Sequence, residues 1–200
     1  MKMTRLMAVA LCAAASVTTT TFAEDDLIES ASPVAIADPV NPQPGMVLSG
    51  YKISFRRASR STWLKDSIPT LPKTPAIKTV VDKSEYFSLK PLDATEANVG
   101  MWSGFLKCKR AGVYTLTLSG GKTVNEGYSL RVNGKTAIAS GKAQTSADVA
   151  LKVGWNKIEL VGAFGKKPIN LSFKPKDSLS DARSLAPAMM FYDKKPEEDW

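Results

Sequence analysis

The sequence predicts an all-β protein, an antiparallel sandwich or jelly roll, and three observations lead to this class. Apolar and polar residues alternate in several short runs, which is the period-two pattern of half-buried strands. Turn signals separate these runs at intervals of about 8–12 residues, the spacing typical of sandwiches. No long stretch has the 3.6-residue period of an amphipathic helix, so almost no helix is expected.

The first strand is expected after Met46, where Tyr51, Ile53 and Phe55 alternate with polar residues. The proline-rich residues 57–75 are expected to be irregular, because proline cannot donate to a strand ladder. The other elements expected before residue 99 are short strands over 77–81 and 86–89 and at most one helical turn over 93–98.

The clearest strand signals lie between residues 99 and 174. Tyr114, Leu116 and Leu118 alternate with Thr and Ser, which indicates a strand with one apolar face. Asn133-Gly134 separates two β-runs and predicts a type I′ hairpin, because both residues adopt positive φ at little cost. Further strands are expected at 128–132, 136–138, 149–153, 158–160 and 169–173, with a turn at Gly154 and with Lys157 and Glu159 facing outward.

The chain begins with the pattern of a secretory signal peptide over residues 1–23. Lys2 and Arg5 precede a short apolar run, and Ala23 offers a small residue at the cleavage site. That run is shorter than the roughly 20 residues that cross a bilayer, so no transmembrane span is expected. We therefore expect a secreted, periplasmic or cell-surface protein. Its parts are expected to be a flexible linker over 24–45, one domain over 46–192 and an acidic tail over 193–200.

The composition argues against most enzymatic chemistry. The chain contains no histidine, which removes the Ser-His-Asp triad and histidine-bearing zinc sites. One cysteine, Cys108, remains after the expected signal peptide, and it is expected to be buried as a small apolar residue. The carboxylates are widely spread, so their spacing predicts no acid–base pair and no calcium site. We expect a protein that is not an enzyme, with no cofactor and no bound metal.

The domain carries a surplus of positive charge, and the whole chain has a formal net charge of +8. Such a surface suits anionic polysaccharide or acidic glycans, but scattered lysines also serve simply to keep a protein soluble. Nucleic acid is not expected as a partner, because no recognition motif is present.

Four segments together resemble the PA14 domain, over roughly residues 99–174. They are a Trp-x-Gly strand at Trp102–Leu106, a Gly-x-Tyr strand at Ala111–Leu116, a strand and hairpin at Tyr128–Lys135, and a Leu-x-x-Gly-x-x-x-Ile segment at Val149–Leu160. The resemblance implies a β-sandwich of the kind found in bacterial toxins, glycosidases and adhesins, often with a carbohydrate-binding role. The same segments are also similar to jelly-roll carbohydrate-binding modules of families 6 and 35.

One departure from the PA14 pattern concerns calcium. Sugar-binding PA14 lectins carry paired acidic residues after the Gly-x-Tyr strand, whereas this chain has Ser119–Thr123, which contains no acid. Calcium-dependent sugar binding of that type is therefore not expected. A sugar site would have to use aromatic and amide side chains instead.

The candidate ligand-binding residues are Trp63, Asn125 and Glu126. Trp63 lies in the irregular stretch, where an exposed indole would stack on a sugar, although it would equally plug the end of the sandwich. Asn125 and Glu126 lie in an expected loop and would hydrogen-bond hydroxyls, or simply be solvated. Trp102 and Trp155 are expected in the core.

The sequence thus predicts an exported module that binds glycans or cell-envelope polysaccharide. The alternative is a structural or accessory protein of a surface or periplasmic assembly, which would act through contacts with a protein partner.

Overall fold

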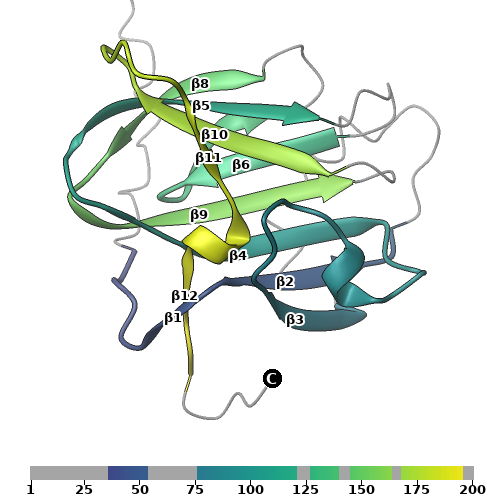
Figure 1. Cartoon of the computed structure of the whole chain (residues 1–200). Helices are drawn as coiled ribbons and strands as arrows, with labels where there is room; N and C mark the ends of the chain where they lie inside the picture. Colours follow the sequence, from purple (N-terminus) through teal and green to yellow (C-terminus); the bar gives the residue numbers. More distant parts are fainter. Residues whose placement is uncertain (1–35, 54–75, 121–126, 140–144, 164–167, 196–200) are drawn as a thin grey trace, which may run out of the picture. The chain divides into compact units, whose positions relative to one another are not determined.

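Two antiparallel sheets pack face to face in the computed structural model (Figure 1). The structure describes residues 36–53, 76–120, 127–139, 145–163 and 168–195. Within these ranges no helix is long and apolar enough to span a membrane. The larger sheet contains β1 (Pro42–Pro44), β2 (Met46–Tyr51), β3 (Lys78–Asp82), β4 (Val99–Cys108), β6 (Gly127–Val132), β7 (Lys135–Ala139), β9 (Gly154–Ala163) and β12 (Phe191–Asp193).

The smaller sheet has the strand order β11-β10-β5-β8. Its members are β5 (Gly112–Gly120), β8 (Ser146–Leu151), β10 (Ile169–Pro175) and β11 (Arg183–Leu185). Among the described residues, two short 3₁₀ helices lie outside the sheets, at Lys90–Leu92 and Pro187–Met189. The expected all-β sandwich class is confirmed.

The centre of the larger sheet is the long pairing of β4 with β9. The two strands are in register from Val99↔Ala163 to Cys108↔Gly154. On the far side of β4, β2 pairs with its first half and β12 with a later position, while β6 and β7 follow β9 on the other side (Figure 1). The β4–β9 register therefore fixes which residue of β9 lies opposite each residue of β4.

The core lies between the sheets and contains the apolar residues of the alternating runs. Trp102 and Leu160 from the larger sheet and Leu116 and Leu171 from the smaller one are fully buried. The Trp102 ring meets Phe87 edge to face, with ring centroids 5.6 Å apart. The expectation that Trp102 belongs to the core is confirmed. Cys108 is also buried, as expected.

The strong strand signals gave the right elements. The runs around Tyr114, Leu130 and Leu171 are strands β5, β6 and β10. Asn133 and Gly134 have φ of 50° and 79°, the positive pair that a type I′ turn requires, and they join β6 to β7 as expected.

The weaker signals before residue 99 were partly wrong. The first strand ends at Tyr51 instead of continuing through Ile53, because the Asn98 side chain bonds both the N–H and the C=O of Ile53. Phe55 lies outside the described residues. The run at 86–89 forms only one bridge, Phe87↔Ile169. The stretch 93–98 contains one turn, closed by the Ala97 N–H and the Ala94 carbonyl at 3.2 Å, and a separate 3₁₀ helix at Lys90–Leu92 precedes it. The expected strand at 77–81 is β3.

The short strands β1 and β12 pair with each other at the edge of the larger sheet. Pro42 and Pro44 belong to β1, in the stretch where a linker is expected, and proline is typical of edge strands because it has no N–H to leave unpaired. The pairing is extended by a hydrogen bond from the Lys194 N–H to the Asn41 carbonyl.

Candidate functional site

The sequence-predicted ligand residues cannot be placed in the fold. Trp63 falls in residues 54–75, and Asn125 and Glu126 fall in residues 121–126, all outside the described ranges. They remain predictions.

Aromatic side chains gather instead on the outer face of the larger sheet. In β4, Trp102, Gly104 and Leu106 face the core, so the alternate residues Phe105 and Lys107 face outward. The same alternation in β9 turns Ile158 and Leu160 inward and Trp155 outward. The expectation that Trp155 belongs to the core is therefore wrong. Its side chain is only partly buried, and its contacts lie on the outer face.

Three rings and one ammonium group form what we call the outer aromatic platform: Phe105, Trp155, Phe191 and Lys107. Trp155 lies between the two phenylalanines, with ring centroids 6.4 Å from Phe105 and 5.2 Å from Phe191, both edge to face. The Nζ of Lys107 lies 5.1 Å from the centroid of the Trp155 ring, a cation–π contact. The register explains these contacts, because Lys107 is opposite Trp155 and Phe191 is opposite Phe105.

A short chain of ion pairs continues the platform across β9 and β6. Glu159 accepts from Lys157 at 2.9 Å and lies 3.6 Å from the Arg131 guanidinium. Glu159 is directly opposite Arg131 in the sheet. Lys157 and Glu159 lie on the outer face as the sequence predicts, but Glu159 is buried there. Because both its oxygens are engaged, Glu159 is a constituent of the sheet surface and not a free acid.

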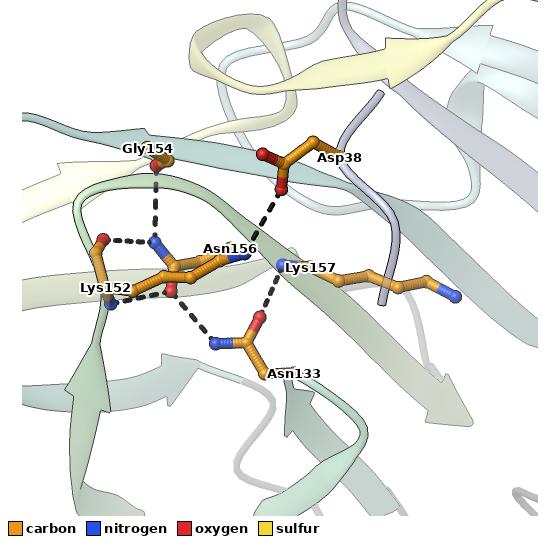
Figure 2. Close-up of polar contacts among 6 residues, drawn as sticks. All are labelled: Asp38, Asn133, Lys152, Gly154, Asn156 and Lys157. Atoms are coloured by element: carbon orange, nitrogen blue, oxygen red, sulfur yellow. Dashed lines mark hydrogen bonds and ion pairs between the residues drawn. The ribbon is translucent and has the colours of Figure 1, made fainter. Parts of the chain in front are cut away.

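A tight turn aims Trp155 outward. Gly154 adopts φ of +87° at the start of β9, where glycine avoids the strain that a side chain would suffer. The next residue but one, Asn156, is fully buried and clamps this turn (Figure 2). Its Nδ2 donates to the carbonyl of Lys152 at 2.9 Å and contacts that of Gly154 at 3.4 Å, while its Oδ1 accepts from the Lys152 N–H at 3.0 Å. Trp155 is thus held between two fixed backbone positions.

The clamp is tied to the hairpin on β6 and β7. Asn133 donates through Nδ2 to the Asn156 Oδ1 at 2.9 Å and accepts from the Lys157 N–H at 2.9 Å (Figure 2). Lys152 makes a further exposed ion pair with Asp38 at 3.1 Å. These contacts satisfy the buried Asn156 amide completely, which marks the cluster as a support for the turn and not as a ligand site.

Gly104 brings the third ring to the platform. A Cβ at this position would lie 2.8 Å from the carbonyl oxygen of Phe191 and 2.9 Å from the Met46 side chain. Only glycine permits β12 to approach β4 this closely. The glycine of the Trp-x-Gly segment therefore has a local role: it allows Phe191 to lie beside Phe105.

The described residues contain no cluster of three or more His, Cys, Asp or Glu side chains that would hold a metal ion. The strand β5 ends at Gly120, and the rest of the segment where PA14 lectins carry their acidic pair lies outside the described ranges.

Sequence reasoning missed the platform because its members lie far apart in the chain and no single segment carries them. A signal did exist: the parity that turns Lys157 and Glu159 outward also turns Trp155 outward. The position of Phe191 had no comparable local signal, because β12 pairs with β4 only at Phe191↔Phe105, across a long sequence separation.

Solved structures identify the fold. A PA14 sugar-binding domain from an RTX adhesin is 15% identical to this chain, covering 76% of it and 99% of the domain, with a TM-score of 0.50. The A domain of epithelial adhesin 9 from Candida glabrata, solved in complex with Galβ1-3GlcNAc, is 8% identical. That match covers 80% of this chain and 97% of the adhesin domain, with a TM-score of 0.53.

A third similar structure is an anti-sigma factor domain-containing protein, 16% identical over 82% of this chain, with a TM-score of 0.52. The chain spans about half the length of that protein, since 51% of it is covered. The sequence matches no family model and no curated protein. The likenesses in structure establish a PA14-like β-sandwich, as the sequence motifs implied.

Proposed function

We propose that this chain is a non-catalytic glycan-binding module that contacts its ligand through the outer aromatic platform. The observation that carries the proposal is the platform itself, three aromatic rings grouped on one face of a sheet outside the core. Aromatic rings supply large apolar contact area at low entropic cost, and grouped surface aromatics on a soluble domain are typical of binding sites. A sugar ring with its apolar C–H face is a suitable ligand for such a surface.

The fold supports the same function. Two of the similar structures are described as a sugar-binding domain and as an adhesin domain in complex with a disaccharide. Export, which the N-terminal sequence predicts, would bring the module to extracellular or envelope glycans. Because the platform consists of aromatic rings and one ammonium group, we expect ligand binding there to require no metal.

The test is binding of the purified protein to a broad glycan array, with and without a calcium chelator. We expect chelator-resistant binding that the substitution Trp155→Leu reduces by about tenfold, the effect of losing one well-placed aromatic contact. Val113→Ser is the matched control, because Val113 is an exposed apolar residue on the smaller sheet. Thermal unfolding of each variant verifies that the fold is kept.

The same experiment separates the platform from the site predicted by sequence. If Trp63→Ala abolishes binding and Trp155→Leu leaves it unchanged, the glycan site lies at Trp63 and the platform proposal is refuted. If no glycan binds, the glycan-binding function itself is refuted.

A protein-contact role is the second candidate, and the sheet edge favours it. Strand β8 ends the order of the smaller sheet in the described part of the chain, with Asp148 and Ala150 exposed. An edge strand of six residues offers backbone groups to an added strand. Absence of glycan binding together with capture of a specific partner, lost when Ala150 is replaced by proline, would favour this role.

A further inference from the structure

We propose that the outer aromatic platform selects anionic glycans, and that Lys107 is the group that binds the anion. This inference rests on the proposed glycan-binding function and specifies its ligand class. It follows from the position of Lys107, from the charges around it and from the regular spacing of the sheet.

Lys107 is held where a ligand on Trp155 would meet it. The two residues are directly opposite in the β4–β9 register, and the ammonium lies 5.1 Å from the centre of the indole ring. The cation–π contact reduces the freedom of the long side chain before any ligand arrives. The ammonium lies over one part of the indole ring, so a sugar that contacts the rest of the platform has a positive charge at a defined position.

No carboxylate neutralises Lys107 within the described residues. The ion pairs of this face involve its neighbours, since Lys157 and Arg131 share the single carboxylate of Glu159. Asp193 on β12 accepts a hydrogen bond from the Asn41 backbone N–H at 2.8 Å. The outer face thus carries three cations, Lys107, Lys157 and Arg131, and Lys107 is the one of them with no acidic partner among the described residues.

The spacing of the sheet matches this combination of contacts. Same-face residues along a strand are about 7 Å apart, and neighbouring strands about 4.8 Å. Trp155 and Lys107 lie on neighbouring strands. The strand spacing of about 4.8 Å is similar to the distance between a sugar ring and a charged substituent on it. A neutral sugar would contact the rings alone. A sugar with a carboxylate or a sulfate would gain a charge-assisted contact as well.

The test compares glycans before and after removal of their charge. The probes are three uronic-acid polysaccharides (pectate, alginate and hyaluronan) with their carboxyl-reduced forms, and a sulfated galactan with its desulfated form. Affinity is measured by calorimetry at physiological salt for the wild type, Lys107→Met and the control Lys174→Met. The control removes the same charge from strand β10 of the smaller sheet.

We expect Lys107→Met to weaken binding of an anionic chain by about fivefold, as for an exposed ion pair of good geometry. Binding of its uncharged form should weaken less, so that the ratio of the two affinities falls, and Lys174→Met should affect neither. The uronate and sulfate arms show which anion the site takes.

Three results would overturn the inference. Equal affinity for charged and uncharged forms, with no effect of Lys107→Met, leaves the glycan-binding function standing and removes the anion selectivity. An equal loss in Lys107→Met and Lys174→Met means that only the overall positive charge matters. Failure of every glycan, charged or not, to bind either here or on the array refutes the proposed function as well.

Discussion

Replacing Asn156 by alanine should destabilise the domain by about 3 kcal/mol. Three well-formed hydrogen bonds join its side chain to the Lys152 backbone and to Asn133, at 2.9 to 3.0 Å. A buried hydrogen bond contributes about 1 kcal/mol net. The side chain is 0% exposed, so the substitution also leaves polar groups to find new partners. For a domain of this size, about 3 kcal/mol corresponds to a fall in Tm of about 6–12 °C.

The assay is urea unfolding followed by tryptophan fluorescence, analysed with the wild-type slope. Asn156→Asp has nearly the same shape but turns a carboxylate oxygen toward two carbonyls, so it should destabilise the domain at least as much as alanine. The exposed Asn170 on β10 supplies the matched control, and Asn170→Ala should stay within about 0.5 kcal/mol of the wild type. A double-mutant cycle with Asn133→Ala should give a coupling of about 1 kcal/mol.

A loss below about 1 kcal/mol for Asn156→Ala would refute this reasoning, because it would mean that water replaces the clamp at little cost. Wild-type stability of Asn156→Asp would refute it in another way. It would show that the shape of the side chain, and not its donors, supports the turn.

Two further predictions concern Gly104 and Cys108. Gly104→Ala should cost about 1–3 kcal/mol, because its Cβ would meet the Phe191 carbonyl at 2.8 Å. It should also weaken glycan binding by moving Phe191, and unchanged urea midpoint and affinity would contradict the packing argument. Burial raises the pKa of the Cys108 thiol, partly offset by a hydrogen bond with Asn156. Its reaction with a disulfide reagent at pH 8 should therefore be at least about tenfold slower in the folded protein than in urea, and equal rates would contradict its burial.

The strands that the sequence predicted correctly are those whose signal is local. Leu116 and Leu118 alternate with polar residues, and Asn133-Gly134 combines turn chemistry with two flanking runs. Each of these signals spans only a few residues, so a short segment of the sequence contains all the information needed to predict the element. The hairpin and β5 follow directly from it.

The platform could not be predicted in the same way. Its rings come from β4, β9 and β12, and only the sheet order brings these strands together. Trp155 was assigned to the core because it occupies a position of the PA14 pattern, although the alternation of its own strand turns it outward. The end of β2 was also missed, since it depends on the Asn98 side chain, which is distant in sequence from Ile53.

The pairing of β1 with β12 gives the module a mechanical weak point. Residues 41 and 194 meet at the same end of this short ladder, so a pulling force applied across them would open its pairs one after another, like a zipper. The prolines of β1 leave Gln43 as the one residue of that strand with an N–H to donate. Peeling β12 away would carry Phe191 off the platform. Tension applied across these two residues would therefore weaken ligand binding before the rest of the sandwich unfolds.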